Sequence, residues 1–292
     1  MLDIVENHIV HSVQEACSCL NADPQAIVIA GGTDVLIKIR EGKLAGAHLV
    51  SIGEISELKG VTIKENGDIV IGPLTTFAEL EEDPLIRKYI PLLGKASGMV
   101  GGPQIRAAGT VGGNVCNGVT SADTASSICA MNAKMTAVSI NGKREYSIHE
   151  HYVGAGKVSL QQGEILTAIT IPASEYQGYC GSYTKYAMRN AMDIATLSCS
   201  VWLKLDKGGK VLEDIRIAYG VAAPVPMRAF KTEKALKGMA VAQALKEAPA
   251  LIRREVNPRD SWRASRKFRL HIAGEILQRT IKEAIEQGGA AC

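Results

Sequence analysis

Hydrophobic positions follow two periods along the chain, one typical of amphipathic helices and one typical of buried strands. Helical spacing is clear over residues 10–20, where Val13, Ala16, Cys17 and Leu20 fall on one face. Short apolar runs predict strands, and further helical stretches lie between them. The predicted strands are 26–30, 49–52, 61–64, 69–72, 133–140 and 165–171, and the other predicted helices are 35–39, 76–82 and 92–100.

The order of elements changes in the second half of the chain. Residues 172–181 are rich in Gly, Ser and Tyr, and we place a domain boundary there, between a first domain at 1–175 and a second at 180–289. Strands followed by helices predict a small sheet packed on helices. The predicted strands are 182–186, 197–205 and 215–221, and the predicted helices are 232–237, 241–254 and a long final one after Asp260 and Ser261.

Composition restricts the classes of function. The 292 residues are 46% hydrophobic, enough for one large or two moderate cores. A net charge of +3 with scattered Lys and Arg, and only 4% aromatic residues, argue against nucleic-acid binding. No stretch approaches the ~20 apolar residues of a membrane helix, residues 1–9 lack an export pattern, and seven irregularly spaced cysteines do not form a disulfide framework. We expect a soluble cytoplasmic protein.

The first candidate binding segment is Ile-Ala-Gly-Gly-Thr-Asp at 29–34, on a predicted strand-to-helix turn. Adjacent glycines let backbone N–H groups converge, and the start of a helix favours a phosphate. The segment matches neither the G-x-G-x-x-G pattern nor a Walker loop. Taken alone, a plain tight turn is the more frequent explanation of such a short motif.

The second candidate segment has four glycines in the ten residues 109–118 and closes with Ser-Ala-Asp at 121–123. So many glycines are entropically costly unless the backbone passes close to a ligand. Glycine N–H groups could meet pyrophosphate oxygens, and Asp123 could accept a hydrogen bond from a ribose hydroxyl. The alternative is a glycine-rich connector without a ligand.

Other candidates indicate neither a metal nor a nucleophile. His149 and His151 could share one strand face, but no third ligand lies nearby, so we expect a solvent-facing pair. The cysteines lack iron–sulfur or zinc spacing. No Ser-His-Asp or Cys-His arrangement is apparent, and we assign no catalytic residue and no metal site.

Together these motifs resemble the FAD-binding subunits of xanthine dehydrogenase-type molybdenum hydroxylases, which include the medium subunits of CO dehydrogenases. The resemblance rests on Ala-Gly-Gly-Thr-Asp at 30–34, Thr-Val-Gly-Gly-Asn at 110–114 and Ser-Ala-Asp at 121–123. It continues through Lys-Tyr-Ala-Met-Arg-Asn-Ala-Met-Asp-Ile-Ala at 185–195 and Ser-Trp-Arg-Ala-Ser-Arg-Lys-Phe-Arg at 261–269. It covers nearly the whole chain, and the order and spacing of the motifs are more specific than any one of them.

The resemblance implies an α+β fold. Its first domain would be a two-lobed FAD-binding domain of the vanillyl-alcohol-oxidase (PCMH) type, and its second would be a small antiparallel sheet packed on helices, as in CO dehydrogenase flavoproteins. It also implies two groups of backbone contacts with FAD. The pyrophosphate would be wrapped by Val28, Ile29, Ala30, Gly31, Gly32, Thr33, Asp34 and Val35, and a second cradle would comprise Thr110, Val111, Gly112, Gly113 and Asn114.

The resemblance implies further single contacts. Asp123 would hold the adenosine side and Leu166 would give an apolar contact. Lys185 would lie beside the cofactor and stabilise negative charge on the reduced ring, although most lysines are simply solvated. Val100 replaces an aromatic residue of some relatives, so it is open whether anything stacks on a ring there. We also expect valine at Gly32 or Gly112 to abolish flavin retention by filling space reserved for phosphate.

The partners implied are an iron–sulfur subunit with two [2Fe–2S] clusters and a molybdopterin subunit that oxidises a purine. Electrons would pass from a cluster through FAD to NAD⁺. Three alternatives stay open from the sequence. They are the flavin subunit of another hydroxylase, acting on carbon monoxide, nicotinate or an aromatic thioester; a free-standing flavin oxidase; and a non-catalytic nucleotide-binding module.

Overall fold

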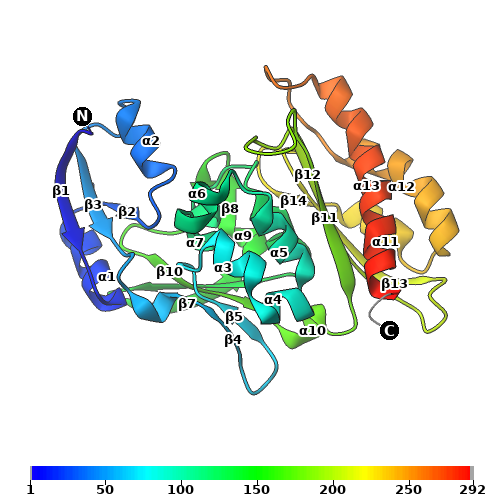
Figure 1. Cartoon of the computed structure of the whole chain (residues 1–292), viewed down its shortest axis with the longest axis horizontal. Coiled ribbons are helices and arrows are strands. Elements are labelled where there is room, and N and C mark those ends of the chain that lie inside the picture. Colours follow the sequence, from blue (N-terminus) through cyan, green and yellow to red (C-terminus); the bar gives the residue numbers. More distant parts are fainter. Residues whose placement is uncertain (1, 290–292) are drawn as a thin grey trace.

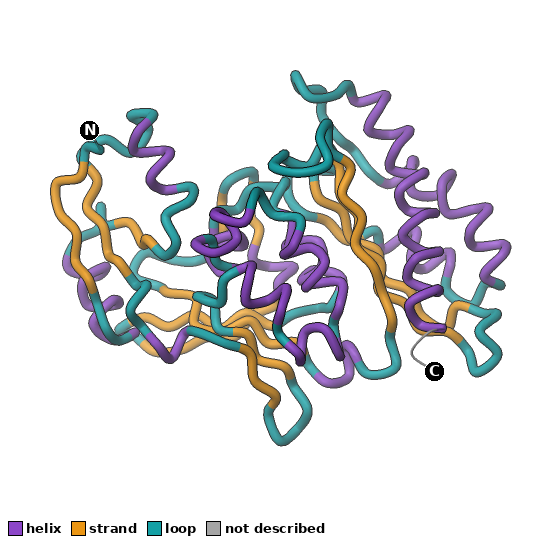
Figure 2. Tube along the Cα trace, viewed as in Figure 1, coloured by secondary structure: helices purple, strands orange, loops and turns teal. Residues whose placement is uncertain are grey.

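The computed structural model describes residues 2–289 and contains helices and strands in separate layers (Figures 1 and 2). The N-terminal lobe is a parallel sheet of order β1-β3-β2 with α1 packed against it. Its elements are β1 Ile4–Ile9, α1 Val13–Ala22, β2 Ile27–Ile29, α2 Val35–Arg40, β3 Ala47–Ser51 and the short 3-10 helix Ser56–Leu58. Cys17 and Leu20 of α1 are buried against Val50 of β3, as the helical spacing predicts.

The second lobe is an antiparallel sheet of order β4-β5-β10-β6-β7, covered by short helices. Helix α8 is buried along its whole length. The strands are β4 Val61–Ile63, β5 Ile69–Ile71, β6 Lys134–Ser139, β7 Gly142–Ser147 and β10 Ile165–Ile171, with the separate pair β8 Tyr152–Gly154 and β9 Lys157–Val158. The helices are α3 Phe77–Glu82, α4 Pro84–Tyr89, α5 Pro91–Gly98, α6 Pro103–Ala108, α7 Val111–Cys116, α8 Asp123–Ala130, α9 Ile148–His151 and α10 Ala173–Tyr176.

The C-terminal part is an antiparallel sheet of order β11-β12-β13-β14 between two helical layers (Figure 1). One face packs on α5 and α8, and the other on the C-terminal helices. Burial on both faces explains why β12 reads as a nearly continuous apolar and small-residue run. The elements are β11 Cys180–Tyr186, β12 Leu197–Leu205, β13 Leu212–Gly220, β14 Met227–Arg228, α11 Phe230–Leu236, α12 Val241–Glu255 and α13 Arg266–Gly289.

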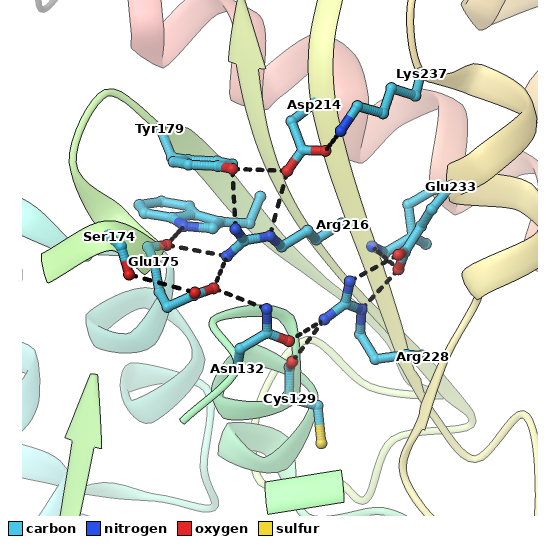
Figure 3. A network of polar contacts seen from close by, with 12 residues as sticks. Cys129, Asn132, Ser174, Glu175, Tyr179, Asp214, Arg216, Arg228, Glu233 and Lys237 are labelled. Carbon is cyan, nitrogen blue, oxygen red and sulfur yellow. Dashed lines mark hydrogen bonds and ion pairs between the residues drawn. The ribbon is translucent and has the colours of Figure 1, made fainter. Parts of the chain in front are cut away.

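A polar network fixes this sheet to the second lobe (Figure 3). Arg216 on β13 pairs with Glu175 of α10 at 2.7 Å. Arg228 on β14 donates to the carbonyl of Cys129 and to Asn132 Oδ1, at 3.2 and 2.6 Å, at the end of α8. Because α8 also leads from the second glycine segment, the network sets the position of the C-terminal sheet relative to that segment.

The α+β class and the sheet-on-helices C-terminal part are as predicted, but several elements differ. Strand β1 is almost fully exposed, so hydrogen bonding to β3 defines it without an apolar pattern. Helix α4 and strand β7 were also not predicted. Residues 103–108, for which no element was predicted, form α6, and residues 111–116 of the second glycine segment form α7. No helix within residues 2–289 combines the length and the apolar content needed to cross a bilayer.

Candidate functional site

A cavity of about 590 Å³ lies between the turn after β2, the start of α7 and strand β10. Helices α2 and α7, which belong to different lobes (Figure 1), both contribute residues to the lining of the cavity. A volume of this size is usual for a small-molecule or cofactor site. The site residues expected from the sequence that line the cavity are Val28, Ala30, Gly31, Gly32, Thr33, Asp34, Val35, Val100, Thr110, Gly112, Gly113, Asn114 and Leu166.

The two glycine segments are in direct contact at one edge of the cavity. A Cβ atom on Gly31 would lie 1.7 Å from the carbonyl oxygen of Ala108 and 3.1 Å from Cα of Gly109. Only glycine permits so close an approach of the two backbones. Gly31 therefore joins the segments to each other, in addition to any contact with a ligand.

The turn of the first segment offers unused backbone donors. Gly32 has φ +70°, a left-handed conformation that favours glycine. Among the hydrogen bonds of residues 2–289, none has the backbone N–H of Gly31, Gly32, Thr33 or Asp34 as donor. Consecutive free amides around a left-handed residue form a concave site for an anion. This turn can therefore bind phosphate oxygens.

The second segment differs, because the protein already uses its amides. The N–H of Val111 donates to Thr75 O at 3.0 Å and that of Gly112 to Pro73 O at 2.8 Å. The N–H of Gly113 donates to the side chain of Thr110 at 3.1 Å, which caps α7. These bonds explain why a glycine-rich sequence forms a helix here.

Gly112 and Gly113 face in different directions. A Cβ on Gly112 would lie 2.4 Å from Cβ and 2.6 Å from the carbonyl oxygen of Pro73, so this glycine is required for packing within the protein. The reason given from the sequence, space reserved for phosphate, is therefore wrong for Gly112. A Cβ on Gly113 would meet only Thr110 Oγ1, at 3.1 Å, and Gly113 is an exposed part of the cavity lining. The surface that a ligand can approach is that of Gly113.

Apolar side chains form most of the remaining wall. Leu166 and Ile165 come from β10, and Val100 and Ile105 from the segment before α7. Phe77, at the start of α3, also lines the cavity and is 3% exposed. Phe77 and Ile105 were not predicted from the sequence, because one apolar residue in a helix has no signal that separates a ligand wall from ordinary core.

Four expected site residues do not line the cavity. Ile29 and Val111 are buried beneath it. Lys185 and Asp123 form an ion pair of 2.8 Å, and Lys185 also donates to the carbonyl of Met99 at 2.9 Å, next to Val100 in the chain. The expected contacts of these residues with a cofactor stay predictions.

Each carboxylate oxygen of Asp123 accepts a hydrogen bond from a protein donor, and Lys185 binds one of them. The other oxygen accepts from the hydroxyl of Tyr183 at 2.7 Å. Burial raises the pKa of Asp123, while the ammonium of Lys185 and the Tyr183 hydroxyl act in the opposite direction. The ion pair with Asp123 therefore holds the ammonium of Lys185 close to Met99, the residue before Val100.

Polar and ionisable residues of the lining include several that the sequence analysis did not select. Lys38 Nζ donates to Asn117 Oδ1 at 2.7 Å, from α2 to the residue after α7. Glu164 is held by Arg144 through bonds of 2.6 and 2.7 Å, which lower the pKa of Glu164. Lys38 lies on the predicted helix 35–39, where a lysine is usually solvated, so the sequence had no signal that selected it.

Two further expectations concern cysteine and histidine. Cys116 lines the cavity, and burial raises its pKa to about 12, so it contributes a neutral thiol. His149 and His151 lie on the short helix α9, not on a strand. The prediction of a solvent-facing pair is wrong for His151, which is fully buried beside Tyr146 and whose pKa burial lowers to about 4.

The lining suits a flavin dinucleotide. Free amides at 31–34 match a pyrophosphate, the bare surface of Gly113 allows close approach, and the apolar walls match the flat faces of ring systems. The nature of the donors therefore fits FAD, which the sequence motifs had indicated.

Comparisons with known proteins agree with this geometry. Residues 4–174 match the family described as the FAD binding domain in molybdopterin dehydrogenase, and residues 182–284 match the CO dehydrogenase flavoprotein C-terminal domain. The chain is 39% identical over 290 residues to the xanthine dehydrogenase FAD-binding subunit of Escherichia coli O157:H7, covering 99% of each. It is 28% identical to the carbon monoxide dehydrogenase medium chain of Hydrogenophaga pseudoflava, covering 96% of each. A solved structure of carbon monoxide dehydrogenase from that organism matches 98% of the chain and 99% of its own with a TM-score of 0.92.

Proposed function

The chain belongs to the FAD-binding subunits of the molybdenum hydroxylase family, and from this premise we propose that it is the flavin subunit of a xanthine dehydrogenase. In this role it takes electrons from [2Fe–2S] clusters on one partner subunit and passes them to NAD⁺. A second partner carries molybdopterin and oxidises the purine. The proposed division of the chain is a FAD-binding domain at 1–175 and a C-terminal domain at 180–289.

The observation that carries the choice of xanthine dehydrogenase is the level of identity over the full length. The relative named for xanthine dehydrogenase shares 39% of residues, and the one named for carbon monoxide dehydrogenase shares 28%. Both cover at least 96% of this chain, so the difference does not arise from partial alignment.

The residues of the cavity would bind and orient FAD. The free amides of 31–34 would hold the pyrophosphate, and the bare surface at Gly113 would form a floor next to it. Val100 and Leu166 would exclude water from the ring end, while Lys185, fixed by Asp123, would place a positive charge nearby. When bound, FAD supplies a carrier that accepts electrons singly and donates them in pairs as hydride.

The charged side chains that line the cavity favour an electron-transfer role over a substrate pocket within this chain. Among residues 2–289, the charged side chains that line the cavity are Asp34, Lys38 and Glu164. Glu164 is already bound by Arg144 in two hydrogen bonds. The part of the lining formed by residues 2–289 offers no pair of free carboxylates for acid–base work on a substrate, which supports a protein that binds and tunes its cofactor.

The test is purification of the untagged chain from its own cells at native abundance, followed by mass spectrometry of everything that co-purifies. The proposal predicts an iron–sulfur chain and a molybdopterin chain, and a complex that reduces NAD⁺ when given xanthine. Carbon monoxide, nicotinate and an aromatic thioester, offered to the same preparation, test the other hydroxylases. Turnover with one of these and none with xanthine would replace the proposed substrate.

The acceptor is tested separately on the isolated chain. Anaerobic mixing of the FAD-loaded chain with NADH should bleach the flavin absorbance, since hydride transfer between the two is reversible. NADPH is the matched control, and bleaching by neither would contradict the assignment of NAD⁺. Oxidation of a small substrate by the chain without partners would instead support a free-standing oxidase.

A further inference from the structure

The charge of the dinucleotide must be balanced inside the cavity. A pyrophosphate brings two negative charges, and two of the lining residues, Asp34 and Glu164, are acidic. Glu164 is neutralised by Arg144. Of the described residues that line the cavity, Lys38 is the only cation. Lys185 is already paired with Asp123 and does not line the cavity.

The placement of Lys38 on α2 directs its side chain toward the free amides. The N–H of Lys38 donates to the carbonyl of Asp34 at 3.0 Å, so Lys38 lies one helical turn after the residues of the turn. Side chains of a helix lean toward its N-terminus and cover the preceding turn. This lean favours a side chain of Lys38 that extends toward 31–34, and Lys38 and these residues line the same cavity.

The present partner of Lys38 is neutral. Its ammonium is part-buried and donates to Asn117 Oδ1 at 2.7 Å, across the cavity from α2 to the residue that ends α7. No ion pair of Lys38 occurs among residues 2–289. An ammonium has three hydrogens to donate, and its bond to an ionised oxygen is about twice as strong as one to a neutral oxygen.

We propose that Lys38 binds the pyrophosphate of FAD and is the principal side-chain counter-charge of the dinucleotide. Asn117 holds the ammonium in place, and the free amides at 31–34 supply the remaining donors. This inference rests on the assignment of the cavity to FAD and extends it to a residue outside both glycine segments.

The test is equilibrium binding of FAD to the apo-protein at low and at high salt, with the quenching of flavin fluorescence as the signal. Lys38→Gln should raise Kd for FAD roughly 10- to 150-fold, the range for losing a hydrogen bond to a charged group. Salt should weaken binding to the wild type more than to Lys38→Gln, because screening acts on the charge that the variant lacks.

Two variants separate binding from a structural role. Lys43→Gln removes the same charge from an exposed lysine that pairs with Glu41, and it should leave Kd unchanged. Asn117→Ala removes the bridge but keeps the charge, so it should weaken FAD binding less than Lys38→Gln does and preserve the salt dependence. Apo-protein melting temperatures of all variants should match that of the wild type.

Two results would overturn the proposal. One is a wild-type Kd and salt dependence in Lys38→Gln. The other is an equal loss in Lys38→Gln and Asn117→Ala with unchanged salt dependence, which would assign the pair a structural role only. Failure of the wild type itself to bind FAD would be a different outcome, and it would refute the cofactor assignment on which Lys38 depends.

Discussion

Two adjacent glycines at the start of α7 should respond in opposite ways to the same substitution. Gly112 packs on Pro73, whereas Gly113 faces the cavity. Alanine at position 112 should therefore destabilise the apo-protein. Alanine at position 113 should leave stability nearly unchanged, and valine there should abolish FAD retention while the protein stays folded.

The magnitudes follow from the contacts. At Gly112 the new Cβ would lie 2.4 Å from Cβ of Pro73, so the helix must move by about an ångström to restore normal contact, at a cost of about 1–3 kcal/mol. That movement also strains the Gly112 N–H bond to Pro73 O, worth about 1–3 kcal/mol more when its groups are left unpaired. The melting temperature should fall by roughly 4–15 °C.

At Gly113 the new Cβ meets only Thr110 Oγ1 at 3.1 Å. Replacing a helical glycine with alanine gains up to about 1 kcal/mol of helix propensity, which offsets a slightly compressed cap. The larger side chain of valine extends into the cavity, where the cofactor would pass. Its effect should appear in Kd for FAD and not in the melting temperature of the apo-protein.

The assay pairs thermal melting of the apo-protein with FAD titration for all three variants. A native melting temperature for Gly112→Ala would show that the contact with Pro73 relaxes freely. Native FAD affinity in Gly113→Val would refute the position of the cofactor, because the bare surface would then not be a contact.

Three further predictions concern stability and are measured by urea denaturation. Lys185→Met should lower the free energy of unfolding by about 3–5 kcal/mol near neutral pH, because it leaves the buried Asp123 carboxylate without its cation. Adding Asp123→Asn to this variant should recover most of the lost stability. Loss of the Lys185 ammonium, which lowers the pKa of Asp123, should raise the already elevated pKa of this carboxyl further, so the Lys185→Met deficit should grow as pH rises above the wild-type pKa of Asp123. Acidification from about pH 6.5 to 4 should lower the free energy of unfolding by about 3 kcal/mol through His151. The unfolded histidine takes up a proton over this range, whereas the buried one, whose pKa is lowered to about 4, does not. The variant His151→Phe should show a smaller decline, and an equal decline in the variant would assign the effect to other groups. Gly31→Ala should destabilise by more than about 3 kcal/mol, since its Cβ would overlap the carbonyl of Ala108 at 1.7 Å, and a native unfolding curve would contradict the close contact.

The elements that the sequence predicted share one property, which is burial of an apolar face. Strand β10 is a mostly apolar run broken only by two threonines, and α1 has apolar residues at helical spacing, so both could be predicted from the sequence. Strand β1 is held by backbone pairing with β3 and has little burial, so its sequence has no alternation to detect. Helix α7 contains two glycines and depends on Pro73 and Thr75 from elsewhere in the chain.

The candidate site was predictable where glycine was required and not where a single side chain acts. Glycine is required at Gly31 by the close approach of two backbones and at Gly112 by packing on Pro73, and motif spacing was enough to select both segments. Lys38 and Phe77 have no such mark, because a lysine on a helix is usually solvated and a phenylalanine is usually core. The pairing of Lys185 with Asp123 joins residues far apart in sequence, and only the fold brings them together.

The most direct test of the account is a crystal structure of the chain saturated with FAD. The pyrophosphate should accept hydrogen bonds from the backbone N–H groups of residues 31–34, with Gly113 in contact beneath it and Lys38 Nζ within hydrogen-bond distance. A dinucleotide bound with its phosphates away from both glycine segments would contradict the central claim that the two segments form one cofactor site.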